Sequence, residues 1–440
     1  MAETFKRSRN IEESSSNWAE LYCDVLEHIF QFLSFKDVLI VEGVCRPWFS
    51  AAKAFIKSRF QSCQLVPWLL LPPDDGRATS EYCILNMETK NVSKLKNIYN
   101  EMSNGCCIGS SHGWLIFLDE SVAPLLLNPF LQVKIKLPRL NSLMGILEIA
   151  RNDIYWEYCI YYYDKKRKFS VSYAMNLREN VIHKAVLHLH DSCFSIKGFT
   201  IIVIYGVNAK LAYCKTGENS CWMDLEAKHQ PYHEILCTNS QLYALSSNSI
   251  EVWDFDDGTP IKRMDLELTN FPEKSSKFFW LGDRELYATK FYLAEIHGEV
   301  MLMVRLIGEY VNGDDEAIRE EDLLIEDDTH PLVCPYKTLL FHVYKLDLAE
   351  RNWVEVDSLG DYAVFLGGNN SVTVSTQFYK NSIFFTDDYW SRMNEDYLYG
   401  GHDIGIFHLE DYSVEPIYPY GSEKIQPPPC WVNPSPWSAV

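Results

Sequence analysis

From about Cys63 onward the chain is a succession of short apolar runs, each bounded by Gly, Asn, Asp or Pro. A run of four to eight apolar residues between turn-forming residues is typical of a β-strand, and many such runs indicate an all-β domain. Aromatic residues make up 14% of the sequence, which favours the same class because rings pack well on a pleated surface. The clearest runs are Val66–Leu71, Trp114–Leu118, Ile201–Tyr205, Leu242–Leu245, Val300–Val304, Phe341–Leu346 and Ile383–Phe385.

These runs repeat as a unit in which a polar turn leads into an apolar strand, and a second strand follows that ends in another polar turn. The first halves are Ser111–Phe117, Asn239–Leu245, Ile296–Leu302 and Tyr379–Phe385. The second halves are Leu125–Pro129, Ile250–Asp254, Phe341–Asp347 and Ile404–Leu409. Radial repetition of small sheets protects strand edges, so we predict a β-propeller of six or seven divergent blades over residues 63–440. A pair of β-sandwiches is the alternative architecture.

The N-terminal part has a different pattern. Residues 1–17 are polar and are expected to form a disordered tail. Leu21, Val25 and Ile29 then recur at helical spacing, and Ser34 with Asp37 predicts the start of a second helix. Pro47 suits the first turn of a third helix, where its missing N–H costs nothing. Residues 18–62 are thus predicted to form a small helical domain, which makes the chain an α+β multidomain protein.

Two segments interrupt the strand pattern. Residues 313–328 carry nine acidic residues and one Arg, which predicts a solvated loop; a contact site for a basic partner is the alternative. The tail from Gln426 holds five Pro and two Trp, a composition that excludes regular helix and central strand. This tail is expected either to dock on the propeller through its Trp side chains or to act as a ligand for another protein.

Charge and cysteine content exclude several classes of protein. The 60 acidic and 40 basic residues give a net charge of −20, the opposite sign to that of a protein that binds nucleic acid by bulk charge. No apolar run is long enough for a membrane helix, and the N-terminus lacks the apolar segment of a secretory signal. The 13 Cys are irregularly spaced and include no C-x-x-C, which indicates a reducing compartment rather than a disulfide framework or a zinc site.

Catalytic and metal motifs are incomplete. Gly109–Gly113 matches G-x-S-x-G, but a strand follows it where a nucleophile elbow requires a helix, so a tight turn is expected. Asp254–Gly258 lacks the later Glu of a calcium loop and predicts a hairpin turn. His183, His188 and His190 have no Cys or carboxylate companions that would make a metal site. Lys165–Lys168 lies between two apolar runs, so a charged hairpin turn is a simpler interpretation than a nuclear import signal.

Residues Trp18–Trp48 resemble an F-box. The order Leu21, Asp24-Val25-Leu26, Ile29, Leu33, Asp37 and then Val44-Cys45-Arg46-Pro47-Trp48 carries the resemblance. Tyr22 departs from it, because the F-box usually has Pro after its first Leu. The β region resembles the kelch-like propeller, of largely uncharacterised type, that follows the F-box in a large group of plant proteins. Cys107–Leu115, Leu127–Pro129, Ile135–Pro138, Trp353–Gly367 and Ile383–Asp388 carry that second resemblance.

The resemblance implies the substrate receptor of a Skp-cullin-F-box ubiquitin ligase, in which the F-box docks on a Skp-type adaptor and the propeller holds the target protein. The adaptor-binding residues that it implies are Leu21, Val25, Ile29, Leu33, Val44 and Trp48. Such a receptor performs no chemistry, so we expect no catalytic residue, metal or cofactor, no nucleic-acid or membrane partner, and a cytoplasmic or nuclear location. The alternatives are a propeller hydrolase or lyase, and a scaffold that binds the adaptor without ubiquitin transfer.

Overall fold

The computed structural model of the chain divides into two compact units, Met1–Cys63 and Gln64–Val440. The structure describes residues 18–33, 35–62, 66–72, 82–95, 105–119, 122–130, 133–140, 143, 146–152, 157–162, 168–171, 181–189, 199–217, 220–238, 241–255, 259–272, 286–319, 322, 336–395, 400–417, 425 and 427–433. The predicted tail, residues 1–17, lies outside these ranges.

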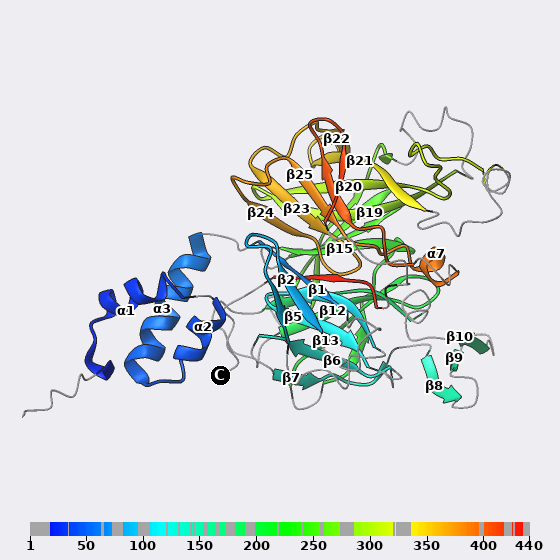
Figure 1. The fold of residues 1–440 in the computed structure, drawn as a ribbon. Coiled ribbons are helices and arrows are strands. Elements are labelled where there is room, and N and C mark those ends of the chain that lie inside the picture. The colour runs from blue at the N-terminus through cyan, green and yellow to red at the C-terminus, as the bar shows by residue number, and fades with distance from the viewer. Residues whose placement is uncertain are drawn as a thin grey trace, which may run out of the picture. The chain divides into compact units, whose positions relative to one another are not determined.

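The first unit is helical, as the sequence predicts (Figure 1). Its elements are the 3-10 turn η1 (Trp18–Glu20) and the helices α1 (Cys23–Phe30), α2 (Phe35–Val41) and α3 (Arg46–Ser62). Pro47 is the second residue of α3, within the first turn, where no intrahelical N–H bond is lost. Ser34, the residue expected to start the second helix, lies outside the described residues.

The second unit is a β-propeller of six blades, which confirms the predicted fold (Figure 1). The number is six rather than seven, and the alternative of packed β-sandwiches is wrong. In sheet order from the axis outward, the first blade is β28–β1–β2–β3 (Cys430–Val432, Trp68–Leu71, Cys83–Asn86, Val92–Lys94) and the second is β4–β5–β6–β7 (Cys106–Ser111, Trp114–Leu118, Pro124–Asn128, Val133–Lys136). The third blade is β11–β12–β13–β14 (Ile182–Leu189, Phe199–Tyr205, Lys210–Lys215, Trp222–Asp224) and the fourth is β15–β16–β17–β18 (Tyr232–Thr238, Gln241–Ser246, Ser249–Asp254, Ile261–Glu267). The fifth blade is β19–β20–β21–β22 (Tyr287–Ile296, Glu299–Gly308, Lys337–Asp347, Asn352–Glu355) and the sixth is β24–β23–β25–β26–β27 (Val372–Ser375, Tyr362–Leu366, Ser382–Phe385, Gly405–His408, Val414–Pro416).

A further small sheet interrupts the chain between the second and third blades. It consists of β8 (Ile146–Asn152), β9 (Glu157–Tyr162) and β10 (Lys168–Val171), which pair only with one another. The pairing of β9 with β10 is antiparallel, and these strands flank the Lys165–Lys168 segment for which a hairpin turn was predicted. Residues 163–167, the turn itself, are not among the described residues.

The apolar runs of the sequence are continuous because the blades are buried on both faces. Six separate apolar clusters lie between neighbouring blades, one for each of the six interfaces. Within β1, Leu69 and Leu71 pack towards the sixth blade, whereas Leu70 packs towards the second. Successive side chains of a strand point to opposite faces, so a strand with a neighbour on each side needs apolar residues at every position.

The repeated unit of the sequence corresponds to the two middle strands of four blades. Ser111–Phe117, for example, leads into β5, and Leu125–Pro129 forms β6. The turns that precede these middle strands hold non-glycine residues in the left-handed region, with φ of 51° at His112, 54° at His297 and 53° at Asn381. The G-x-S-x-G segment is therefore a β4–β5 turn, as predicted, and not a nucleophile elbow.

The C-terminal tail closes the ring. Strand β28 pairs with β1, so the last described strand forms the inner edge of the first blade. Trp431 is fully buried, donates from Nε1 to the Leu366 carbonyl at 2.8 Å, and packs edge-on against Phe365. The composition of the tail excluded a regular helix and a central strand, and β28 agrees with this because it is an edge strand of only three residues. The docking alternative is confirmed for Trp431; Trp437 lies outside the described residues.

The described part of the acidic segment is an exposed turn, in agreement with the prediction of a solvated loop. Val311 and Ala317 form an isolated β-bridge, and the Asn312 side-chain oxygen accepts hydrogen bonds from the backbone N–H groups of Asp314 and Glu316. Lys337 pairs with Asp315 at 2.6 Å. Of residues 320–328, only Asp322 is described.

Candidate functional site

The helical unit has a very small core. It consists of Leu26, Phe30, Val38, Ala51, Ala52 and Phe55. The Phe30 ring is the centre of this cluster, with ring centroids 5.6 Å from Phe55 and 5.8 Å from Trp48. A core of this size cannot cover the apolar side chains of three helices, so part of their surface stays in contact with water.

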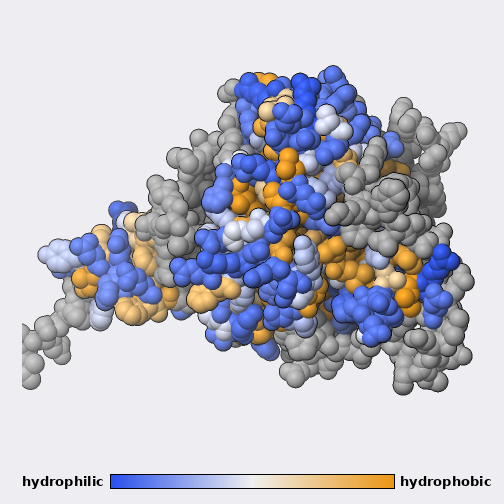
Figure 2. All heavy atoms as spheres, turned by 90° about the horizontal axis from the view of Figure 1, so that it is seen from above, coloured by the Kyte–Doolittle hydropathy of each residue, from blue (hydrophilic) through white to orange (hydrophobic). Residues whose placement is uncertain are grey.

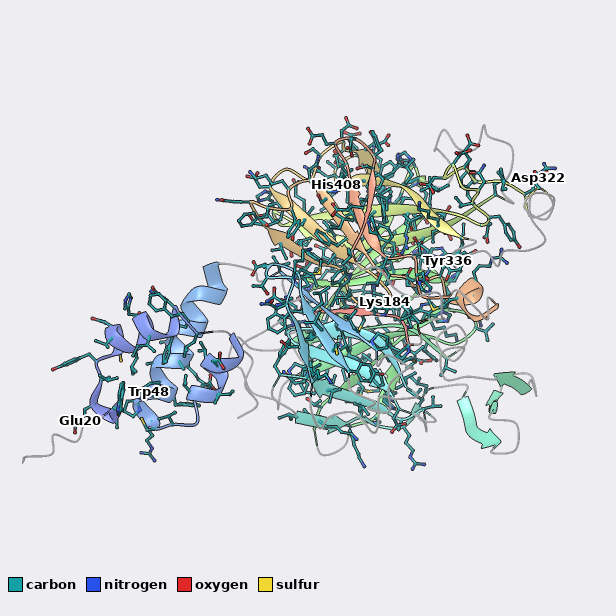
Figure 3. The ribbon with its side chains drawn as sticks, viewed as in Figure 1. Glu20, Trp48, Lys184, Asp322, Tyr336 and His408 are labelled. Atoms are coloured by element: carbon teal, nitrogen blue, oxygen red, sulfur yellow. The ribbon has the colours of Figure 1, made fainter. Side chains whose placement is uncertain are left out.

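The six residues predicted to bind an adaptor fall into two groups. Val25 and Val44 are exposed, with exposed fractions of 45% and 58%. The other four are half-buried and pack against the core of the helical unit; they are Leu21, Ile29, Leu33 and Trp48. Trp48, labelled in Figure 3, also donates from its indole Nε1 to the Trp18 carbonyl at 2.8 Å. These four side chains therefore stabilise the fold of the unit and also form part of its surface.

Further large apolar side chains of this unit are exposed. Tyr22 is 83% exposed, Phe32 78%, Ile40 62% and Trp18 61%. Figure 2 shows apolar atoms, in orange, gathered on the helical unit. Sequence reasoning did not select Phe32 or Ile40, because both lie outside the apolar stripe that defines the core. These residues could have been found in the sequence as large apolar side chains at positions where the helical periodicity predicts exposure to water.

Tyr22 preserves the geometry of the residue that it replaces. It is the N-cap of α1, with φ −64° and ψ 146°, and its carbonyl accepts hydrogen bonds from the Val25 and Leu26 N–H groups at 3.0 and 3.1 Å. Proline fixes φ near this value. The helix therefore begins as it would after a proline, and the difference lies in the exposed phenol ring.

The propeller holds a polar cavity of about 390 Å³ on its axis. It lies among the first residues of the inner strands β11, β15 and β19, and beside the loops that follow β23 and β25. Lys184, labelled in Figure 3, lies within the ring of blades at this level. The lining residues are His183, Lys184, His233, Glu234, Thr289, Lys290, Phe291, Tyr292, Gly367, Gly368, Asp388 and the Trp390 of helix α7 (Trp390–Glu395).

Two ion pairs cross the cavity wall. Lys184 of the third blade pairs with Glu234 of the fourth, and both side chains are nearly inaccessible to water. Burial raises the pKa of Glu234, and the Lys184 ammonium opposes this rise. Lys290 of the fifth blade pairs with Asp388 of the sixth, with Nζ 3.2 Å from Oδ1. Each pair joins neighbouring blades, so the pairs fix the inner strands as well as the charge of the cavity.

Behind Asp388 lies a fully buried network centred on Arg305. The guanidinium contacts Asp388 Oδ1 at 3.1 Å and Asp403 Oδ2 at 2.8 Å, and it donates to Thr338 Oγ1 at 2.7 Å. Burial alone would lower the pKa of Arg305, but Tyr292, Asp403 and Asp388 raise it. Burial, together with the Asp403 carboxylate, raises the pKa of the nearby Asp387 to about 6.

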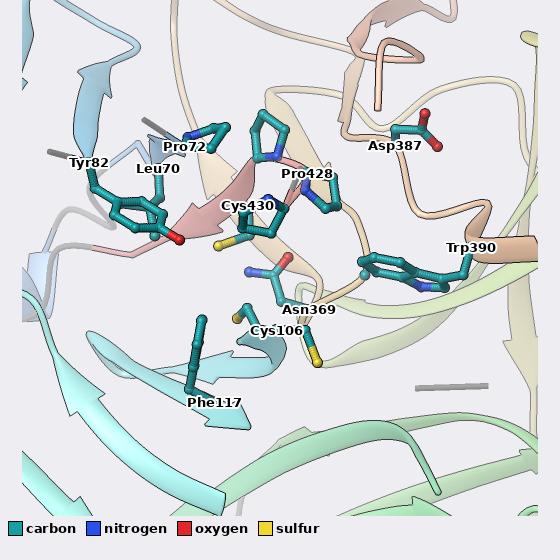
Figure 4. A pocket seen from close by; sticks show the side chains of 14 residues that line it. Leu70, Pro72, Tyr82, Cys106, Phe117, Asn369, Asp387, Trp390, Pro428 and Cys430 are labelled. Carbon is teal, nitrogen blue, oxygen red and sulfur yellow. The ribbon is translucent and has the colours of Figure 1, made fainter. Parts of the chain in front are cut away.

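A second cavity, beside the first, is too small for a ligand. Its volume is about 20 Å³, room for roughly one water molecule (Figure 4). Figure 4 shows Pro428 and Cys430 of the C-terminal tail on one side and Asn369 and Trp390 on others. This space is a packing gap where the closing strand meets the sixth blade.

The histidines considered as metal ligands contact different partners. His183 Nε2 lies 2.9 Å from the Gly206 carbonyl, and the buried His188 packs beside Phe255. His190 lies outside the described residues. Sequence reasoning missed another group, His229, Glu251 and Asp265, whose ligand atoms lie within 4.8 Å of one another. The Lys262 ammonium already occupies this group, 2.7 Å from Glu251 and 3.3 Å from Asp265, so it is an ion-pair cluster on the fourth blade.

The fold and these surfaces define a class: a propeller protein that carries a separate helical module with an apolar surface. Comparison with known families specifies it further. The model of the KIB1-4 β-propeller matches residues 61–408, so the chain belongs to the KIB1-4 β-propeller family. Plant F-box proteins align with most of the length of this chain, which confirms the resemblance seen in the sequence.

Two of these relatives come from Arabidopsis thaliana. The probable F-box protein At4g22060 is 22% identical over 423 residues, which cover 92% of this chain and 93% of that protein. F-box protein KIB4 is 24% identical over 373 residues, which cover 83% of this chain and 81% of that protein. An alignment that covers 92% of the chain extends beyond the propeller unit into the helical unit.

Solved structures are only distantly similar to this chain. Apo AztD from Citrobacter koseri has a TM-score of 0.27 at 6% identity, over 84% of this chain and 100% of that one. The propeller domain of Cps50 (Swd1) from Myceliophteria thermophila has a TM-score of 0.26 at 10% identity, over 72% and 87%. Similarity this low carries no argument about function. Among the described residues, no helix has the length and apolarity needed to cross a membrane.

Proposed function

We propose that the chain is the substrate receptor of a Skp-cullin-F-box ubiquitin ligase. In this proposal the helical unit binds a Skp-type adaptor, through which the receptor joins a cullin, and the propeller binds the target protein. The receptor has no catalytic residue of its own. It acts by holding the target close to a bound ubiquitin-conjugating enzyme, which raises the effective concentration of the target there.

The observation that carries the proposal is the apolar surface of the helical unit. Exposed apolar side chains gathered on a small unit mark a protein-binding surface, because the burial that they lack is regained in a complex. The relatives that align with most of this chain are named as F-box proteins, and these names point to the same role.

The adaptor surface proposed here extends the six residues predicted from the sequence. Val25 and Val44 would be buried directly by the adaptor, because they are already exposed and make no part of the core. Leu21, Ile29, Leu33 and Trp48 would support them from below. Tyr22, Phe32 and Ile40 are exposed aromatic and aliphatic side chains of the kind that anchor interfaces, and we add them to the surface.

Charge substitutions at the two exposed valines test this surface. Purified Val25→Lys/Val44→Lys protein should lose at least about tenfold in affinity for a purified Skp-type adaptor, because an ammonium would be buried without a partner. Val92→Lys/Val207→Lys is the matched control, since these propeller valines are similarly exposed at 49% and 53%. Unchanged adaptor affinity in the Val25→Lys/Val44→Lys protein, or equal loss in the control, would reject the proposed surface.

Ubiquitin transfer separates a receptor from a scaffold. Full-length protein with adaptor, cullin–RING and a ubiquitin-conjugating enzyme should transfer ubiquitin to proteins that the propeller captures. Adaptor binding without any transfer would favour the scaffold.

A further inference from the structure

The proposed function assigns no role to the cavity on the propeller axis, and the chemistry of the cavity is specific enough to assign a ligand class. We propose that it binds a small anionic molecule bearing a carboxylate or phosphate group, with Lys290 as the main contact. The inference does not depend on the proposed ligase function, because it concerns only the propeller.

The acidic groups of the wall are already neutralised by the protein. Glu234 is buried and is held by the Lys184 ammonium and by the Ile235 N–H at 2.9 Å. Asp388 is buried and accepts from the Tyr292 hydroxyl at 2.9 Å and from Arg305 Nη1 at 3.1 Å. A cationic ligand would have to break these contacts in a buried place, which is costly.

Lys290 is the accessible charge of the cavity. Its side chain is 25% exposed, whereas those of Lys184, Glu234 and Asp388 are 8%, 4% and 5% exposed. The Lys290 ammonium contacts Asp388 Oδ1 at 3.2 Å and also donates to the Asp388 carbonyl oxygen. When it turns to a ligand, Asp388 keeps the fully buried guanidinium of Arg305, which it shares with Asp403. A charge-assisted bond from an ammonium to a carboxylate or phosphate is about twice as strong as a neutral one.

The other walls fit a small organic anion rather than a bare ion. Phe291, Tyr292 and Trp390 supply aromatic surface. A volume of about 390 Å³ lies in the range of sites for small molecules. The net charge of −20 repels anions at long range, but at physiological ionic strength this repulsion is screened beyond about 8 Å, so the nearby ammonium dominates.

Binding can be measured by calorimetry and by thermal shift of the full chain. The anionic probes are glucose 6-phosphate and citrate, glucose is the neutral control and putrescine is the cationic control. We expect saturable binding of at least one anion at millimolar concentration or below, and no binding of glucose or putrescine. A short phosphoserine peptide forms a separate arm, which distinguishes a free small molecule from an acidic side chain of a bound protein.

Three variants of the cavity and one control variant locate the site. Lys290→Gln should weaken anion binding about tenfold or more, whereas Lys290→Arg, which keeps the charge, should retain most of it. Lys345→Gln is the matched control, because Lys345 also pairs with a carboxylate, Glu299, but lies outside the cavity. Thr289→Phe places a bulky ring in the cavity while leaving its charges in place, and it should weaken binding even if Lys290→Gln does not fold.

Several results would overturn the proposal. They are the absence of saturable binding by either anion, preferential binding of putrescine, an affinity unchanged by both Lys290→Gln and Thr289→Phe, and binding of the phosphoserine peptide alone. Because none of the altered residues lies in the helical unit, adaptor capture by the same variants should remain at the level of the unmodified protein.

Discussion

The two units of this protein bury their apolar residues in opposite ways. The propeller shares its apolar side chains among six interfaces, so each blade covers its neighbours on both faces. The helical unit has one small core, and it contributes six of the fifteen large apolar side chains that are exposed among the described residues. It is only about a tenth of the chain, so its density of exposed apolar surface is several times higher. A closed ring of blades buries its apolar side chains within itself, whereas a unit of three helices leaves apolar side chains exposed that a partner can bury.

The largest effect is expected in the propeller from Arg305→Met. The substitution leaves the buried Asp388 and Asp403 carboxylates without their shared cation, which should cost about 3–5 kcal/mol of the free energy of unfolding of the propeller. Hydrogen exchange followed by mass spectrometry should show faster exchange throughout the six blades and unchanged exchange in residues 18–62. Lys380→Met is the control, because it breaks an exposed pair with Asp361 and should cost less than about 1 kcal/mol. Equal effects of the two substitutions would contradict the importance of the buried network.

The reciprocal change is Phe30→Ala in the helical unit. Removing a fully buried ring from a core of six residues should cost about 3 kcal/mol, enough to unfold much of so small a unit. Exchange should accelerate in residues 18–62 alone, and adaptor capture should be lost. Phe32→Ala, a phenylalanine two residues away with a ring that is 78% exposed, should leave exchange unchanged. Accelerated exchange in the propeller after Phe30→Ala would show that the two units do not fold independently.

A smaller effect concerns pH. Burial and Asp403 raise the pKa of Asp387 from 3.8 to about 6, so in the folded state this carboxyl takes up a proton at a pH where the unfolded chain does not. Above pH 6 the folded protein must bury the charged carboxylate of Asp387, which destabilises it. Lowering the pH from 7 to 5 should therefore raise the free energy of unfolding of the propeller by about 1 kcal/mol. Denaturant titrations at both pH values should show this gain in the unmodified protein and lose it in Asp387→Asn. A gain of the same size in Asp387→Asn would assign the pH dependence to other groups.

The smallest effect on stability is expected from Val25→Lys, although this substitution should strongly reduce adaptor binding. Val25→Lys lies on the exposed surface of α1 and should change the free energy of unfolding of the helical unit by no more than about 0.5 kcal/mol. Its melting behaviour should thus match that of the unmodified protein while adaptor affinity falls. A strongly destabilised Val25→Lys protein would move Val25 from the binding surface to the core.

The elements themselves were largely predictable from the sequence, because their signals are local. The helices follow from the apolar spacing at Leu21, Val25 and Ile29 and from Pro47, and the middle strands of the blades follow from runs such as Trp114–Leu118. The F-box resemblance depended on the same local spacing. The position of β28 did not follow, since pairing between Cys430–Val432 and Trp68–Leu71 joins residues at opposite ends of the chain.

The sequence by itself determined the two kinds of unit, the strand content and the family. Only the tertiary structure decided the number of blades, the closure of the ring by Trp431, and which apolar residues of the helical unit face water. It also brought Lys184, Glu234, Lys290 and Asp388 from four different blades to one cavity. The physical reason is the range of the interactions: helical and strand periodicity acts between neighbouring residues, whereas closure and the cavity depend on contacts between segments far apart in the chain.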